Sequence, residues 1–451
     1  MNKKLSAREI ISVASMLFGM FFGAGNLIFP VYMGQLAGRN VWPALIGFLI
    51  TGVGLPLMAV AALGVSRSDG LYGLSAKVGR PYGYFFTCLL YLTIGPFFAI
   101  PRCASVSYTV GLHPLLSESA AVSRWPLFLF SLAFFIAALL FSLYPGKILT
   151  WIGKILNPFF LLFLGILILV ALTHPAAAIA DAQAVGQYGT QPLARGFLDG
   201  YNTMDTLAGL AFGIVVVQVI RGLGVTEPGA VAGATVRSGT ISCAAMAVIY
   251  GFVTIAGAQS QVLFGDSGNG GTLLAQMAEH FLGKAGLVIL AVTVTLACLK
   301  TAVGLITSCG EAFAAMFPKG PGYRAWAVIF SLVSLLFANL GLDTIIGYSV
   351  PVLMFLYPLA ITLIALAIFG RLFAHDRAVY LSVTVCTLVG AVYDLLRSLP
   401  DGVRAAMRLD GALETVGSVL PLSGYGLGWV CPAALGLVVG LCIHFVRREK
   451  A

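Results

Sequence analysis

Apolar runs long enough to cross a membrane recur from one end of this chain to the other. Each run holds about 18 or more predominantly apolar residues, which as an α-helix span the ~30 Å hydrocarbon core of a bilayer. Only 10% of the 451 residues are charged, too few to cover a water-soluble protein of this size. The runs also lack the alternation of apolar and polar residues that a transmembrane β-strand needs. We therefore predict an all-α polytopic membrane protein that contacts the lipid bilayer.

We predict twelve transmembrane helices within a single transmembrane domain that spans residues 1–451. The predicted spans lie near residues 10–37, 43–64, 82–110, 125–144, 151–173, 201–220, 238–261, 284–316, 325–341, 345–369, 378–396 and 426–446. The first five spans (residues 10–173) and the next five (residues 201–369) form two groups, and two additional helices follow at residues 378–446. We expect these last two to serve packing or dimerisation, and the sequence leaves the oligomeric state open.

The excess of basic residues, a net charge of +9, follows the predicted topology. If the N-terminus is cytoplasmic, most Lys and Arg residues fall in cytoplasmic segments, and most Asp and Glu residues fall on the opposite side. This is the positive-inside pattern, and it places both the N- and C-termini in the cytoplasm. The basic composition therefore indicates membrane orientation and requires no nucleic-acid partner.

Span one contains a stretch, FFGAGNLIFP (Phe21–Pro30), that is poorly suited to a continuous helix. Gly19, Gly23 and Gly25 each disfavour a helix by about 1 kcal/mol relative to alanine, and Asn26 adds an amide at membrane depth. One interpretation is close helix packing through small residues. The other is a break in the helix, which a membrane protein tolerates only where protein, water or a ligand satisfies the freed backbone groups.

Span six has a matching interruption, GYNTMDTLAGLAFG (Gly200–Gly213), in which polar residues precede Gly209 and Gly213. Spans one and six each begin a group of five, and they cross the membrane in opposite directions. Interrupted helices at corresponding places of two oppositely oriented halves are typical of inverted-repeat secondary transporters, whose substrate site lies near the midplane. The matched pair favours a binding site over simple packing.

The two breaks predict binding groups of opposite charge. A half-helix that begins near Asn26 directs its N-terminal N–H groups at an anion, whereas the freed carbonyls around Gly19–Ala24 attract a cation. A zwitterionic amino acid together with a metal ion or proton fits this pairing. Asp205 lies about one turn before the expected unwinding of span six, and we interpret it as attracting the substrate ammonium or assisting a gate. The alternative is a structural carboxyl near the outer interface.

Span eight carries a lysine near its middle, Lys300, on a face of small and polar residues that ends at Glu311. Its side chain is too short to reach water across half the bilayer, so it needs a buried partner. A structural ion pair is the alternative to a functional role. Arg102 is the other intramembrane cation, in a third span that Gly95 and Pro96 are expected to kink. We regard Arg102 and Glu311 as candidate gate residues.

Other classes of membrane protein are less consistent with this pattern. The sequence of a channel would contain a filter motif or rings of polar pore residues, and this sequence shows neither. An enzyme predicts clustered catalytic groups, but the five histidines are scattered and the eight cysteines form no C-x-x-C or metal-binding pattern. We therefore predict that the protein is not an enzyme and that it needs no cofactor beyond a coupling ion.

Six sequence blocks, taken in order, resemble the branched-chain amino acid:cation symporter family (LIVCS, or BrnQ-type carriers) of the APC superfamily. The blocks are GMFFGAGNLIFP, YLTIGPFFAIPRCASVS, SLYPGK, GYNTMDTLAGLAFG, CLKTAVGL and SVPVLMFLYP, and they extend from the first span into the tenth. The resemblance implies a LeuT-type 5+5 inverted repeat plus two C-terminal helices. It also implies uptake of leucine, isoleucine and valine, coupled to Na⁺, across the bacterial cytoplasmic (inner) membrane.

The resemblance further implies roles for individual residues. The unwound part of span one would hold the substrate carboxylate, and an unwound part of span six, Ala208–Gly213, would hold the amino group and line the side-chain pocket. With Asp205, the residues implied in substrate binding are Phe22, Gly23, Ala24, Gly25, Asn26, Ala208, Gly209 and Phe212. The residues implied in binding a sodium ion are Gly19, Phe22, Ala297 and Thr301.

Lys300 departs from the family pattern, because a hydroxyl is expected at this place in the sodium site. Its ammonium would repel a sodium ion by about 4 kcal/mol at 4 Å in an effective dielectric constant of 20. In one interpretation Lys300 replaces the ion, permanently or by losing and regaining a proton, so that transport is sodium-independent or coupled to H⁺. In the other, sodium binds elsewhere, near Asn26 and the substrate carboxylate.

Overall fold

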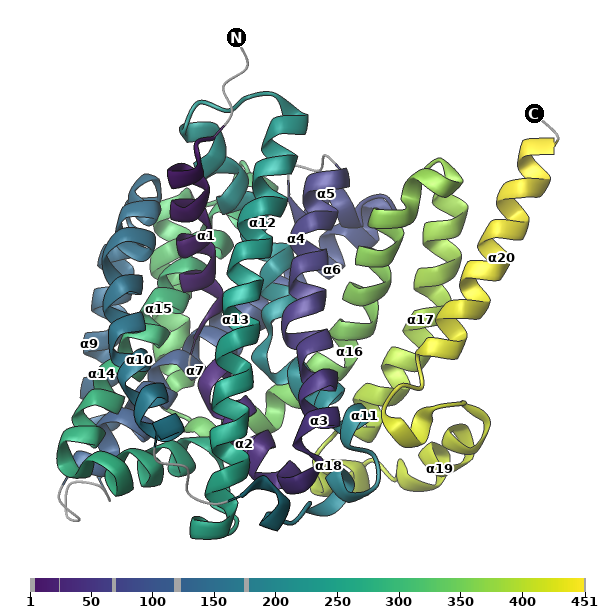
Figure 1. The fold of residues 1–451 in the computed structure, drawn as a ribbon. Coiled ribbons are helices and arrows are strands. Elements are labelled where there is room, and N and C mark those ends of the chain that lie inside the picture. The colour runs from purple at the N-terminus through teal and green to yellow at the C-terminus, as the bar shows by residue number, and fades with distance from the viewer. Residues whose placement is uncertain (1–4, 24, 67–69, 117–122, 174–177, 450–451) are drawn as a thin grey trace.

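The computed structural model describes residues 5–23, 25–66, 70–116, 123–173 and 178–449. Within these residues the chain forms helices, turns and loops, without strands. The long helices run roughly side by side, and α1 (Ala7–Phe21) begins at the same end of the bundle at which α20 (Val430–Glu449) ends (Figure 1). This arrangement agrees with the prediction that both termini lie on one side of the membrane.

Short or irregular turns divide several of the predicted spans into two helices. The first half of the chain contains α1, α2 (Gly25–Ala37), α3 (Val41–Leu49), α4 (Leu55–Ser66), α5 (Leu71–Ser75), α6 (Arg80–Leu92), α7 (Ala99–Val106), α9 (Trp125–Ser142) and α10 (Asn157–Thr173). The second half contains α11 (Pro192–Asp199), α12 (Asp205–Gly222), α13 (Pro228–Phe264), α14 (Gly270–Met316), α15 (Tyr323–Ala338), α16 (Leu342–Phe369), α17 (Arg377–Arg397), α18 (Asp401–Ala406), α19 (Asp410–Val419) and α20.

Ten helical segments of the described residues are long and apolar enough to cross a membrane, which confirms a multi-pass membrane protein. Predicted spans one and two are not separate in this count, because the part of span one after the break continues with span two as one segment, Gly25–Gly64. The part of span one before the break, α1, has 15 residues, and predicted span nine, α15, is apolar but has 16. The count of twelve and the division into groups at 10–173, 201–369 and 378–446 therefore stay predictions.

Burial separates the interior helices from those at the periphery. The first half of α12, from Asp205 to Gly213, is buried without exception. By contrast, α9 and α20 expose large apolar side chains, among them Leu129, Ile136 and Leu435. Exposed apolar surface of this extent is typical of helices that face lipid. The interrupted span six, in contrast, lies in the protein interior.

Span eight begins at a sharp turn within α14. Gly283 has a positive φ of 59°, which only glycine adopts readily, and it separates a short helix from the long span that follows. The segment Thr272–Phe281 belongs to that short helix. A Cβ on Gly286 would overlap the Ala278 carbonyl, so the two parts of α14 pack closely against each other.

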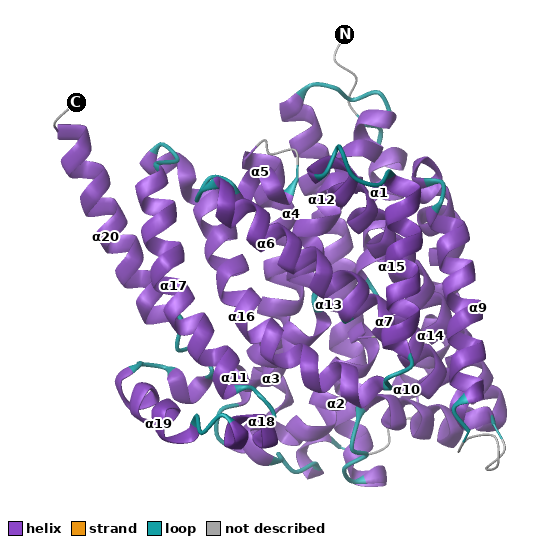
Figure 2. Ribbon diagram, turned by 180° about the vertical axis from the view of Figure 1, so that it is seen from behind, coloured by secondary structure: helices purple, strands orange, loops and turns teal. Residues whose placement is uncertain are grey.

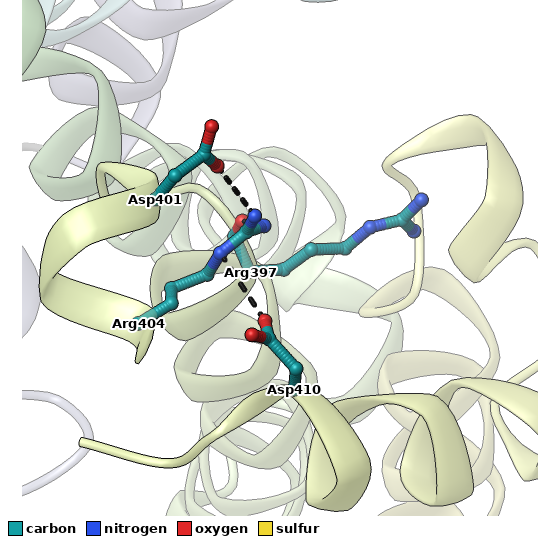
Figure 3. A network of polar contacts seen from close by, with 4 residues as sticks. All are labelled: Arg397, Asp401, Arg404 and Asp410. Atoms are coloured by element: carbon teal, nitrogen blue, oxygen red, sulfur yellow. Dashed lines mark hydrogen bonds and ion pairs between the residues drawn. The ribbon is translucent and has the colours of Figure 1, made fainter. Parts of the chain in front are cut away.

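The last two long helices, α17 and α20, lie together at one edge of the bundle (Figures 1 and 2). The loop between them contains α18 and α19, which Arg404 holds together (Figure 3). The Arg404 guanidinium lies 2.6 Å from Asp401 Oδ1 and 3.5 Å from Asp410 Oδ1, and it donates to the Arg397 carbonyl at 3.0 Å. Because the Asp401 side chain is 94% exposed, these ion pairs order the loop with little gain in stability.

Candidate substrate site between two broken helices

Span one breaks where its sequence predicts. α1 ends just before Phe22, whose ψ of 86° is not helical, and α2 begins at Gly25. The Gly23 N–H donates to Asn26 Oδ1 at 3.0 Å, so a side chain at the start of α2 caps the interrupted backbone. Ala24, also predicted to bind substrate, lies outside the described residues.

Span six also breaks, but earlier than predicted. The 3-10 turn Gly200–Thr203 ends at Met204, which adopts a left-handed conformation with a φ of 61°. From Asp205 onward α12 is a continuous helix. The prediction that Ala208–Gly213 is unwound is therefore wrong, and Asp205 follows the break instead of preceding it.

Packing against α4 explains the two glycines on which that prediction rested. A Cβ on Gly209 would lie 3.0 Å from the Pro56 carbonyl oxygen, and one on Gly213 would overlap the Leu63 side chain. Both contacts are with α4, so these glycines let the two helices approach closely, as small residues do in membrane helix packing. In span six the glycines indicate packing, and the break lies upstream of them.

Asn26 connects the two breaks directly. Its Nδ2 donates to Asp205 Oδ2 at 2.7 Å and to the Tyr250 hydroxyl, and Tyr250 on α13 donates to the same carboxylate oxygen at 2.8 Å. All three residues are buried, with at most 2% of their surface exposed. Since hydrogen bonds to an ionised group are roughly twice as strong as neutral ones, this cluster holds the starts of α2 and α12 against α13.

Arg102 approaches the same place from span three, which is interrupted as predicted. Gly95 has a non-helical ψ of −122°, and α7 begins only after Phe98. Arg102 Nη1 donates to the Asn202 carbonyl at 2.9 Å, within the turn that precedes the span-six break. Its guanidinium carbon lies 5.3 Å from the centre of the Phe29 ring on α2. Three interrupted spans therefore meet at one point.

A small cavity lies between these interruptions. Its polar lining includes the side chains of Asn26, Arg102, Thr203, Asp205 and Thr301. Its apolar lining includes those of Met20, Phe21, Ile94, Ala208 and Leu305. The cavity thus presents one buried carboxyl group and one buried guanidinium beside an apolar surface, which is the chemistry that an apolar zwitterion requires.

The predicted substrate-binding residues divide into two groups. Those that line the cavity are Gly23, Gly25, Asn26, Asp205 and Ala208. Three others lie behind its wall: the Phe22 ring stacks on Phe18, Phe212 packs against Phe21, and Gly209 faces α4. In this conformation the second group supports the cavity without lining it.

Lys300 is fully buried, as its position predicts, and its partner is an uncharged amide. Its Nζ donates to Asn157 Oδ1 at 3.2 Å and lies 3.5 Å from the centre of the Phe160 ring. Asn157 in turn donates to the Ser15 hydroxyl at 2.9 Å, which extends the chain of contacts to α1. No carboxylate among the described residues forms an ion pair with Lys300 in this conformation, and its functional role stays a prediction.

The residues predicted to bind sodium lie on α1 (Gly19), directly after its end (Phe22) and on α14 (Ala297 and Thr301). A Cβ on Gly19 would lie 3.6 Å from Asn157 Oδ1, so Gly19 adjoins the amide that holds the ammonium. The Thr301 hydroxyl points elsewhere, toward Gly23 and the cavity, and has no hydrogen-bond partner. Ala297 is fully buried on α14. Sodium binding by these groups stays a prediction.

The two candidate gate residues occupy separate places. Glu311 on α14 faces Gln218 on α12. When the Gln218 amide is oriented with its nitrogen toward Glu311, this nitrogen donates to both carboxylate oxygens, at 2.9 and 2.7 Å. Arg102 contacts Asn202 and Phe29, and the described contacts of the two residues do not join them. They do not form one gate pair in this conformation, and a gating role for either residue stays a prediction.

Three residues of this region were not predicted from the sequence to contribute to the site. Tyr250 looks like an ordinary aromatic residue within an apolar span, so no local signal marks it. Asn157 carried a signal, because it is an amide next to a proline inside a predicted span. Met204 gave none, since a left-handed conformation is uncommon for a residue with a Cβ.

Two broken helices that meet around a buried, charged cavity inside a multi-pass helical bundle define a membrane transporter. The chain belongs to the branched-chain amino acid transport protein family, whose model matches residues 6–447. It is therefore a transporter and not an enzyme.

Curated relatives match the whole chain. The branched-chain amino acid permease BrnQ of Lactobacillus delbrueckii subsp. lactis is 52% identical over 451 residues, 100% of each chain. BrnQ of Bacillus subtilis (strain 168) is 40% identical, again over 100% of each chain. A crystal structure of MhsT in complex with L-phenylalanine has a similar fold, with a TM-score of 0.59, 16% identity and coverage of 99% of each chain. This likeness supports a LeuT-like fold, while the 5+5 layout stays a prediction.

Proposed function

We propose that the protein is a secondary active transporter that imports leucine, isoleucine and valine by alternating access across the bacterial cytoplasmic (inner) membrane, with both termini in the cytoplasm. The observation that carries this proposal is the contact of Asn26 with Asp205, which joins the two broken helices beside a cavity lined by ionisable side chains. The names of the full-length relatives, branched-chain amino acid permeases, agree with it.

The chemistry of the cavity suits such a substrate. Asp205 supplies an anion for the substrate ammonium, and the N–H groups of the first turn of α2 are suited to its carboxylate. Met20, Ile94 and Leu305 offer an apolar surface to an aliphatic side chain. Because an apolar pocket distinguishes one methylene by only about 1–3 kcal/mol, we expect the three branched-chain amino acids to compete for one site.

Transport is cation-coupled in this proposal, with sodium favoured by the family resemblance. The alternative is a sodium-independent or proton-coupled carrier in which Lys300 replaces the ion. Its ammonium contacts Asn157 on α10 and lies near Phe18 on α1, so this internal cation on α14 lies beside α1, and α1 and α14 are helices that carry residues predicted to bind sodium. A hydroxyl that lacks a partner, Thr301 Oγ1, is a candidate ligand for an ion on the cavity side.

Uptake of radiolabelled leucine into proteoliposomes tests the proposal. An inward sodium gradient is compared with an equal choline gradient at matched pH and voltage, and then with an imposed proton gradient. We expect uptake that excess isoleucine or valine abolishes, and loss of that uptake in the Asp205→Asn variant. Stimulation of uptake by the sodium gradient would support sodium coupling. Stimulation by the proton gradient, or simple exchange, would support the alternative in which Lys300 replaces the ion. Uptake no greater than in protein-free liposomes under every gradient would overturn the proposal.

A further inference from the structure

Arg102 is a buried cation without a counter-ion. It exposes only 6% of its surface, and its described contacts comprise one hydrogen bond, to the Asn202 carbonyl, and the face of the Phe29 ring. No acidic group among the described residues lies within ion-pair distance of it. A guanidinium carries five N–H donors and stays charged, so burying it in this state is unfavourable unless another group completes its hydrogen bonds.

The position of the guanidinium shows where such a group would bind. An ideal Cβ on Gly25 would lie 3.0 Å from Arg102 Nη2, so the guanidinium lies directly against the first residue of α2. Arg102, Gly25 and Gly23 all line the cavity. The N–H groups at the start of α2 and the second guanidinium nitrogen are therefore neighbours, and both favour an anion.

Asp205 lines the same cavity but does not neutralise Arg102. Its Oδ2 already accepts hydrogen bonds from Asn26 and Tyr250, which hold the carboxylate on the side of α13. Two opposite charges share one cavity without pairing. A zwitterion that bridges them would satisfy both.

We propose that Arg102 binds the α-carboxylate of the substrate and makes a free carboxylate obligatory for recognition. Nη1 remains on the Asn202 carbonyl, and Nη2 together with the first N–H groups of α2 contacts the carboxylate. The inference rests on the proposed transport of branched-chain amino acids, and it assigns the carboxylate end of that substrate. Arg102 is then a specificity-determining residue, whose bond to Asn202 also orients the turn before the span-six break.

Binding of leucine and of leucinamide to the purified protein tests the assignment. Leucinamide keeps the ammonium and the side chain but has no carboxylate. For the unsubstituted protein we expect leucine to bind about tenfold or more tightly than leucinamide, since a hydrogen bond to a charged group contributes at least this factor. In Arg102→Gln we expect leucine affinity to fall to that of leucinamide, while leucinamide affinity changes less than threefold.

Two further variants separate the proposed role from a merely structural one. Arg102→Lys keeps the charge but has one donor nitrogen in place of the guanidinium fork, so it should retain part of the preference for leucine, and exposed Arg39→Gln should behave like the unsubstituted protein. Two results would overturn the inference and leave the proposed function intact. One is unchanged leucine affinity in Arg102→Gln. The other is an equal loss of leucine and leucinamide affinity in both Arg102→Gln and Arg102→Lys. Failure of the unsubstituted protein to bind leucine would overturn both.

Discussion

Asn26 and Asp205 are 179 residues apart in the chain, yet Asn26 Nδ2 donates to Asp205 Oδ2 at 2.7 Å. The same amide accepts from the Gly23 N–H through Oδ1, so one side chain stabilises the break in span one and links it to the break in span six. An amide can do both because it carries a donor and an acceptor. Aspartate at this position would keep an acceptor for the Gly23 N–H but lose the donor to Asp205, and alanine would lose both contacts.

We expect Asn26→Ala to reduce leucine uptake at least tenfold. The change leaves the Gly23 N–H and the Asp205 carboxylate each short of one buried partner, and each loss costs about 1–3 kcal/mol. Uptake per correctly inserted protein is the measurement. Asn339→Ala is a matched control, because Asn339 also donates to a side chain, Ser131, but it follows the last residue of α15 and lies outside the cavity. Equal uptake by the two variants would contradict a role for Asn26 in the site.

Tyr250→Phe removes only the hydroxyl that donates to Asp205, and we expect a milder defect. The ring still packs edge-on against Phe48, so the helix arrangement should persist, whereas the carboxylate loses one of two described side-chain donors. We predict a leucine affinity reduced by roughly three- to tenfold, equivalent to about 0.6–1.4 kcal/mol. Equilibrium binding measures it. Tyr348→Phe on the exposed surface of α16 is the control, and a defect of the same size there would remove Tyr250 from the site.

The two breaks differ in how far their sequences reveal them. In span one, Gly23, Gly25 and Asn26 mark the break because the residues that disfavour a helix are also those that cap it. In span six the glycines serve packing against α4, and the chain breaks at Met204, which adopts a left-handed conformation. A local pattern cannot distinguish these two uses of glycine.

Pairing across the chain was the least predictable part of the site. The position of Lys300 in an apolar span predicts a buried partner, but the sequence separation of 143 residues gives no reason to choose Asn157. Likewise, the acidic character of Asp205 predicts a functional carboxyl, whereas its contact with Tyr250 depends on how α13 packs. The functional residue types could be predicted from the sequence, whereas their contact partners could be identified only from the fold.

Gly23→Leu should abolish leucine uptake. An ideal Cβ at this position would lie 3.0 Å from Thr301 Oγ1, and the longer side chain would extend into the cavity between the broken helices. Gly23→Ala should give an intermediate defect, because only the single tight contact must relax. Gly251→Leu on α13 tests the effect of adding a leucine where no heavy atom lies within 4 Å of the new Cβ. Uptake by Gly23→Leu equal to that by Gly251→Leu would show that the cavity is not the transport site.

Below pH 4 we expect the attachment of α17 to α20 to weaken through Asp376. The Ala378 N–H and His444 donate to its carboxylate and lower its pKa, so the stabilisation is complete above the ordinary value of about 3.9 and is lost as pH falls toward the lowered pKa. Asp376→Ala should lower stability by about 1 kcal/mol at pH 7, as loss of an N-cap does, and this difference should shrink below pH 4. Thermal unfolding in detergent at both pH values measures it, and a difference that grows on acidification would contradict the assignment.

The amide of Asn157 should matter more for stability than the charge of Lys300. Asn157→Leu leaves a buried ammonium with no oxygen ligand among its described contacts, and we expect a loss of about 3 kcal/mol in unfolding free energy. Lys300→Met removes the charge and leaves a flexible apolar chain against the Phe160 ring, so it should be close to neutral. The double variant should therefore recover most of the loss seen in Asn157→Leu, apart from the lost bonds to Ser15. Thermal unfolding of the four proteins forms a double-mutant cycle, and strictly additive effects would show that the ammonium does not depend on this amide.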